Sequence, residues 1–147
     1  MPGTKTPKLG AKPPFDLDGI DHVLLVVESM AAALSFYEDV LGCTLEEKYP
    51  QWGTAQLRAG SALINLVDVS VPQGAWAASP AAGGRNMDHL CIALGRHDEA
   101  ALRRHLAAHR IQIVEESFHA GARGESLSIY IRDPSGNTLE LKGPPST

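Results

Sequence analysis

Apolar residues recur along the chain in two patterns, one typical of strands and the other of helices. The segment Leu24 to Val27 is a short apolar run, which indicates a buried β-strand. A helix should follow, because Ser29 is a favourable N-cap residue and Gly42 a favourable stop. Its buried face would carry, at helical spacing, Met30, Leu34, Tyr37 and Leu41.

The second half of the chain has a similar order of patterns. A helix is predicted after the N-cap residue Asp98, with Leu102 and Leu106 on its buried face and with His109 and Arg110 at its end. The run DPSGN that begins at position 133 is a turn signal between two strands. The remaining expected strands are Thr44–Tyr49, Thr54–Arg58, Ala62–Val67, Ile111–Glu116, Leu127–Arg132 and Thr138–Leu141.

These elements form an internal repeat. The tetrapeptide IDHV at 20–23 is echoed by MDHL at 87–90, and each copy precedes an apolar run, a helix and further strands. Each half also ends on a similar short strand, LINL at 63–66 and TLEL at 138–141. The sequence therefore predicts an α+β fold of two tandem βαβββ modules that form an open β-cup.

The length of 147 residues, 44% hydrophobic and 20% charged, fits one globular domain. We expect a disordered tail over 1–17 and a single domain over 18–143. The domain would consist of repeats at 18–68 and 87–143, joined by a linker over 69–86 that is rich in glycine and proline.

Charge and cysteine content exclude several classes of function. The net charge of −4 provides no basic excess for a nucleic-acid partner, and no run of about 18 apolar residues would span a membrane. The two cysteines form no CxxC pair, which favours free thiols in a reducing, cytoplasmic location.

Strand alternation places several polar side chains on one face. If Val23, Leu25 and Val27 pack on a helix, His22 lies on the opposite face, and the same reasoning places His89 there in the second half. The side chains expected on this concave face are His22, His89, Ser128, Tyr130 and Glu140. Two imidazoles and a carboxylate that converge on one cavity are a set of metal ligands.

The pattern DHV…FYEDVLG…INL…MDHLCIAL…SIYIRDPSGNTLEL resembles the vicinal oxygen chelate superfamily, over about residues 18 to 143. This group includes glyoxalase I, extradiol dioxygenases, fosfomycin-resistance enzymes, methylmalonyl-CoA epimerase and bleomycin-resistance proteins, and the chain looks most like small glyoxalase-domain proteins. The resemblance implies a paired βαβββ fold with one divalent metal ion (Fe, Mn, Zn or Ni) in the cup. The ligands would be His22, His89 and Glu140.

The chain departs from relatives that have four protein ligands, because Asn65 stands where they carry Glu or Gln. We therefore expect three protein ligands completed by water. Asn65 and Ser128 become candidate substrate-binding residues. Tyr130 is a candidate catalytic partner of Glu140, because an enclosed hydroxyl needs a polar contact.

Three further residues are candidates for contact with substrate. His119, expected in the loop before the seventh strand, could act as a general acid or base. Cys91 should face the cup two residues after His89, as a small buried filler or a nucleophile. Arg123 is a possible substitute for the phosphonate-binding residues of fosfomycin enzymes.

The expected function is that of a metal-dependent enzyme acting on a small oxygen-rich molecule by lyase, isomerase or dioxygenase chemistry. The alternatives are a bleomycin-resistance-like binding protein without catalysis and a fosfomycin-type transferase. A homodimer is expected, because one βαβββ module exposes an unpaired sheet edge and half a cup. Relatives often build each site across the dimer, so we expect His22 of one chain to meet His89 and Glu140 of the other.

Overall fold

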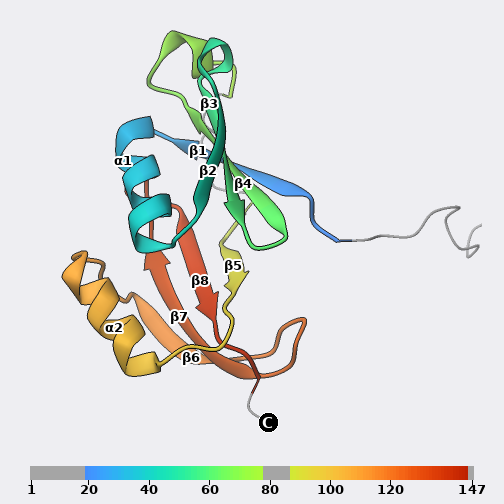
Figure 1. The fold of residues 1–147 in the computed structure, drawn as a ribbon, viewed down its shortest axis with the longest axis vertical. Helices are drawn as coiled ribbons and strands as arrows, with labels where there is room; N and C mark the ends of the chain where they lie inside the picture. Colours follow the sequence, from blue (N-terminus) through green and yellow to red (C-terminus); the bar gives the residue numbers. More distant parts are fainter. Residues whose placement is uncertain (1–18, 78–86, 146–147) are drawn as a thin grey trace, which may run out of the picture.

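The computed structural model describes residues 19–77 and 87–145 (Figure 1). The tail expected over 1–17 and residues 78–86 of the expected linker lie outside the described residues. In the described part of the chain, no helix is both long enough and apolar enough to cross a membrane.

Each repeat contains one helix and four strands. The first repeat comprises β1 (His22–Val27), α1 (Met30–Ser35), the short π-helix η1 (Phe36–Val40) that continues α1, β2 (Thr44–Tyr49), β3 (Thr54–Ala59) and β4 (Ala62–Asp68). The second comprises β5 (Leu90–Ala93), α2 (Glu99–Ala108), β6 (Glu115–His119), β7 (Ser126–Arg132) and β8 (Thr138–Lys142). Two 3-10 turns, η2 (Pro50–Trp52) and η3 (Pro72–Gly74), flank the strands of the first repeat.

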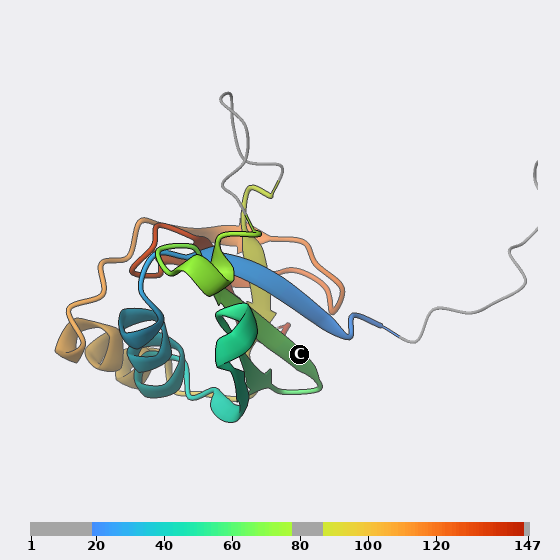
Figure 2. The same ribbon diagram turned by 90° about the horizontal axis from the view of Figure 1, so that it is seen from above.

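The two repeats have the same sheet topology. The strand orders are β1-β4-β3-β2 and β5-β8-β7-β6. The pairs β1–β4 and β5–β8 are parallel, and all the other neighbouring strands are antiparallel. Both sheets are open, and both helices lie on the same side of them (Figure 1 and Figure 2). The predicted α+β fold of two βαβββ modules is therefore confirmed.

A single apolar core lies between the helices and the two sheets. Leu25 and Val27 of β1 contribute to it from the first repeat, and Ile131 and Leu139 from the second. The predicted N-caps are both present, since Ser29 accepts a hydrogen bond from Ala32 N and Asp98 from Ala101 N, each at 3.2 Å. Because the strands alternate around this core, their polar residues face away from it.

The predicted strand Ile111–Glu116 is wrong at both ends, because β6 spans Glu115–His119. Arg110 adopts φ 58°, and Ile111 N donates to Leu106 O, so the chain is still closing the helix at this point. The ladder to β7 begins only at Val114 N, which donates to Tyr130 O at 2.8 Å. His119 consequently lies on a strand and not in the expected loop.

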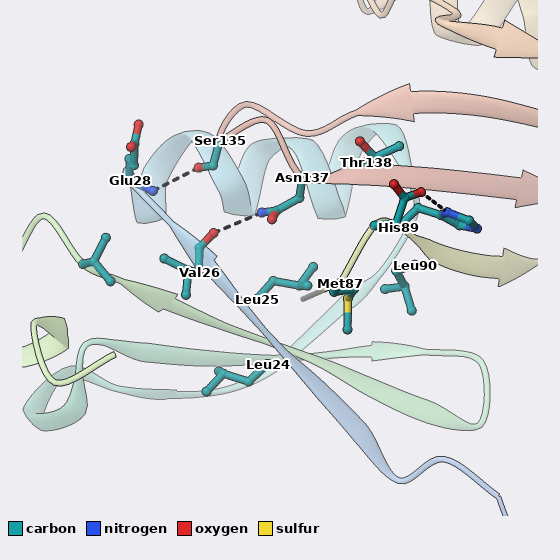
Figure 3. A pocket seen from close by; sticks show the side chains of 12 residues that line it. Leu24, Leu25, Val26, Glu28, Met87, His89, Leu90, Ser135, Asn137 and Thr138 are labelled. Atoms are coloured by element: carbon teal, nitrogen blue, oxygen red, sulfur yellow. Dashed lines mark hydrogen bonds and ion pairs between the residues drawn. The ribbon is translucent and has the colours of Figure 1, made fainter. Parts of the chain in front are cut away.

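Hydrogen bonds join the β7–β8 turn to the first repeat. Asn137 Nδ2 donates to Val26 O at 3.0 Å, and Glu28 N donates to Ser135 Oγ at 2.9 Å (Figure 3). Both contacts hold the end of β1 against the turn predicted from the DPSGN run. The two repeats are thus linked by polar contacts as well as by their shared core.

Candidate functional site

Glu140 is the centre of a polar cluster on the open face of the second sheet. Strand register places it on β8 between Cys91 of β5 and Tyr130 of β7. Ser128 Oγ donates to Glu140 Oε1 at 2.6 Å, and Nε2 of His89 lies 3.0 Å from Glu140 Oε2. The structure therefore brings together the five predicted residues His89, Cys91, Ser128, Tyr130 and Glu140.

The carboxyl group of Glu140 is held in its ionised form. Burial alone would raise its pKa, but hydrogen bonds from Ser128, Cys91 and Tyr130, with the nearby charge of His89, lower the pKa below its usual value. Glu140 is buried, so these donors replace the water that the carboxylate has lost. An ionised, buried carboxylate with an imidazole beside it is a donor pair suited to a divalent cation.

The hydroxyl and thiol groups beside Glu140 remain protonated at neutral pH. Partial burial and the negative charge of Glu140 raise the pKa of Tyr130 to about 12 and that of Cys91 to about 11. Tyr130 is thus a hydrogen-bond donor. Cys91 is exposed, which corrects the expectation of a buried filler, and its raised pKa leaves little thiolate for nucleophilic attack.

Each repeat presents an Asp-His pair with the same geometry. Nδ1 of His89 lies 2.7 Å from Asp88 Oδ2, and Nδ1 of His22 lies 2.6 Å from Asp21 Oδ1. The carboxylate of Asp88 is the largest cause of a raised pKa at His89. A carboxylate on Nδ1 fixes the ring and leaves Nε2 for another contact, as is common for histidines that bind metals.

One chain alone does not assemble the predicted triad. Among the described residues, no three His, Cys, Asp or Glu side chains are grouped so that they could hold a metal ion. His89 and Glu140 contact one another, but His22, at the start of β1, does not complete the group. Asn65 lies on β4 next to Leu24 of β1, on the first sheet.

Two other candidates have contacts away from Glu140. Nη1 of Arg123 donates to Leu94 O at 2.9 Å and Nη2 to Lys142 O at 3.1 Å, so its guanidinium contacts backbone carbonyls. His119 Nε2 lies 2.6 Å from Ser117 Oγ, and its ring centroid is 5.8 Å from that of Tyr130. His119 therefore borders the cluster from β6.

Sequence reasoning missed Lys142, which is buried at the end of β8. Its Nζ donates to Ser126 Oγ at 2.9 Å and also contacts the backbone carbonyl of His119. Register pairs Lys142 with Ser128, and Lys142 lies two residues after Glu140, so both side chains are on the same face of β8. The alternation of the last strand could have found it, because Lys142 follows Glu140 by two residues and therefore shares its face.

A groove of about 350 Å³ runs between the two repeats (Figure 3). Leu24 and Val26 of β1 line it from the first repeat, while His89, Leu90 and Asn137 line it from the second. His89 thus connects the Glu140 cluster to a cavity that both repeats share.

Comparison with known proteins gives the family. The model of the Glyoxalase/Bleomycin resistance protein/Dioxygenase superfamily matches residues 19–141. The chain belongs to this superfamily. Its relatives there include Virulence protein STM3117 of Salmonella typhimurium, 35% identical over 126 residues that make up 85% of this chain and 83% of that protein.

Solved structures agree with this membership of the glyoxalase/dioxygenase superfamily. The crystal structure of STM3117 has a TM-score of 0.67 at 28% identity and covers 89% of this chain and 100% of its own. Lactoylglutathione lyase from Agrobacterium tumefaciens has a TM-score of 0.60 at 26% identity, with 90% and 96% covered. The resemblance inferred from the DHV and DPSGN segments is confirmed.

Proposed function

We propose that this glyoxalase-superfamily protein is a metal-dependent enzyme that acts on a small oxygen-rich substrate in a homodimer. The ion would be held by His89 and Glu140 of one chain and by His22 of the other. The observation that carries the proposal is the 3.0 Å contact between His89 Nε2 and the ionised Glu140, with Asp88 on the opposite ring nitrogen.

The second copy is needed because one chain offers an incomplete ligand set. His22 has the same Asp-His geometry as His89, which suits it to the same task. The two sheets have equal topology and open faces, so a twofold pair can place the first sheet of one chain against the second sheet of the other. Three protein ligands would leave coordination positions for water and substrate.

Two residues of the cluster support the proposed metal site without binding the ion. Ser128 orients the carboxylate of Glu140 through its 2.6 Å hydrogen bond. Tyr130 keeps its proton, because its pKa is raised to about 12, and donates it in a hydrogen bond to Glu140, so its oxygen can accept a hydrogen bond from a substrate hydroxyl. The bound ion would supply Lewis-acid chemistry, polarising substrate oxygens and stabilising the anion that forms.

Metal analysis of the purified protein tests the proposal. Glu140→Gln keeps the shape of the side chain but removes its charge, so bound metal should fall at least about tenfold while the circular dichroism spectrum is unchanged. Glu115→Gln is the matched control, because Glu115 pairs with Tyr130 from β6 but is exposed. Metal-free wild-type protein would reject the enzyme and favour a bleomycin-resistance-like binding protein. Equal metal in the two variants would reject Glu140 as a ligand.

A further inference from the structure

A second pocket lies on the open face of the first sheet, away from the Glu140 cluster. Its volume is about 370 Å³, within the range of small-molecule sites. Leu24, Gln56 and Asn65 line it from neighbouring strands, and Trp52 and Trp76 line it from the turns. All of its lining side chains are uncharged.

Two exposed tryptophans stand at this pocket. Trp52 ends η2 and is 59% exposed, and Trp76 follows η3 and is 57% exposed. Nε1 of Trp76 donates to the backbone oxygen of Trp52 at 2.9 Å, so one ring is fixed relative to the other turn. Large aromatic surfaces left open beside a cavity are suited to stacking against a planar ligand.

Two glycines hold the turns that carry these rings. A Cβ atom on Gly53, which has φ 64°, would lie 2.7 Å from Gly74 N, and one on Gly74 would lie 1.8 Å from Asp68 O. Asp68 N also donates to Gly53 O at 2.9 Å. The two turns, which meet at the top of Figure 1, are therefore in close backbone contact, and the pocket is preformed.

An unsatisfied acceptor lies at the floor of the pocket. Across the sheet, Asn65 of β4 is paired with Leu24 of β1 on one side and with Gln56 of β3 on the other. Within the described residues, Asn65 Oδ1 is buried and has no hydrogen-bond partner. An unpaired buried acceptor is unfavourable, and rotation about the terminal torsion of the amide can turn it toward a ligand donor.

We propose that this pocket binds an uncharged aromatic or heteroaromatic ring with an N–H or O–H group on its edge. The ring would stack against Trp52 and Trp76, and its donor would bond to Asn65. That the ring belongs to the substrate rests on the proposed function, whereas the binding itself requires no metal. A phosphonate or carboxylate would find no cationic partner among the lining side chains.

Intrinsic fluorescence reports on this pocket directly, because the chain has only two tryptophans and both line it. The probe is benzamide, a neutral ring with an N–H donor, added to the purified full-length protein with and without EDTA. We expect saturable quenching in both conditions. Cyclohexanecarboxamide, which lacks the aromatic ring, and benzoate, which is anionic, should bind at least about threefold more weakly.

Variants assign the binding to the pocket. Trp52→Leu keeps the backbone oxygen that Trp76 contacts, and it should weaken benzamide about threefold or more, as should Trp76→Leu. Asn65→Leu removes the unpaired acceptor and should weaken benzamide without lowering the melting temperature. Phe118→Leu, at an exposed aromatic residue on β6, is the matched control and should bind as the wild type does.

The outcomes separate this proposal from the metal site. Benzamide binding that survives EDTA supports the pocket even if Glu140→Gln leaves metal content unchanged. The proposal is overturned by quenching that does not saturate, by equal affinity for benzamide and cyclohexanecarboxamide, or by tighter binding of benzoate. Equal affinity of Trp52→Leu, Trp76→Leu and Phe118→Leu would also overturn it.

Discussion

The hydroxyl of Tyr37 donates a 2.8 Å hydrogen bond to Asp133 Oδ2, and this contact links the two repeats inside the core. Tyr37 is fully buried in the first repeat, and Asp133 begins the β7–β8 turn of the second. The same carboxylate accepts hydrogen bonds from the backbone of Ser135 and Asn137. Asp133 thus organises its own turn and also fixes that turn to the other half of the chain.

Tyr37→Phe should destabilise the fold without disturbing its packing. Burial and the charge of Asp133 raise the pKa of Tyr37, so at neutral pH the hydroxyl is a donor to a carboxylate. Its loss should lower the free energy of unfolding by about 1.5–3 kcal/mol, measured by urea titration. Tyr49→Phe is the control and should change stability by less than about 0.5 kcal/mol. Equal effects of the two variants would contradict this role.

Asp68 should contribute a pH-dependent part of the stability. Burial raises its pKa, but hydrogen bonds from Ser70 and from Met30 N, at the start of α1, outweigh it and lower the pKa below 3.8. The folded pKa is below the unfolded one, so the contribution is full above about pH 4 and is lost as pH falls through the folded pKa.

Asp68→Asn tests that contribution. It should cost about 1 kcal/mol or more at pH 7, and the difference from wild type should shrink below pH 3.8. Urea titrations of both proteins at pH 7 and pH 3 measure the two gaps. A gap of the same size at both pH values would show that the charge of Asp68 is not the cause.

Gly74→Ala should disturb the contact between η2 and η3. The added Cβ would lie 1.8 Å from Asp68 O, so the backbone must move, at a cost of about 1–3 kcal/mol. The emission of Trp52 and Trp76 should shift, which fluorescence measures. Gly95→Ala meets no atom within 4 Å and should leave both stability and emission near the wild-type values.

Ser128→Ala should weaken metal binding without removing a ligand. Without its 2.6 Å hydrogen bond, Glu140 Oε1 is less firmly oriented, and metal affinity should fall about 10- to 100-fold. Ser117 lies opposite Ser128 on β6 but its hydroxyl contacts His119, so Ser117→Ala is the control. Competition with a chelator measures both affinities, and equal values would contradict the positioning role of Ser128.

Much of the fold could be predicted from local patterns. The repeat of DHV and DHL, the N-caps Ser29 and Asp98, and the alternation in β7 and β8 each depend on residues close in sequence. The alternation correctly placed Ser128, Tyr130 and Glu140 on one face, because each strand has one side on the core.

The remaining features depend on contacts between distant segments. The start of β6 is set by the end of α2, where Arg110 adopts a positive φ, and sequence gives no strong sign of it. The pocket between Trp52 and Trp76 exists because Gly53 meets Gly74 across two turns. In the proposed dimer, the position of His22 relative to Glu140 depends on a second chain, which no pattern within one chain specifies.

Complementation between two chains that each lack one metal ligand tests the shared metal site most directly. A His22→Ala chain and a Glu140→Ala chain, carrying different affinity tags, are unfolded, mixed and refolded, and the mixed dimer is purified for metal analysis. A mixture of His89→Ala and Glu140→Ala chains is the matched control, because in either arrangement each of its sites keeps a lesion.

If each site combines His22 of one chain with His89 and Glu140 of the other, the first mixed dimer has one intact site and one doubly damaged site. Its metal content should therefore return to about half that of the wild-type dimer, with none in the control. A verified mixed dimer of His22→Ala and Glu140→Ala chains that binds no metal would contradict the shared site.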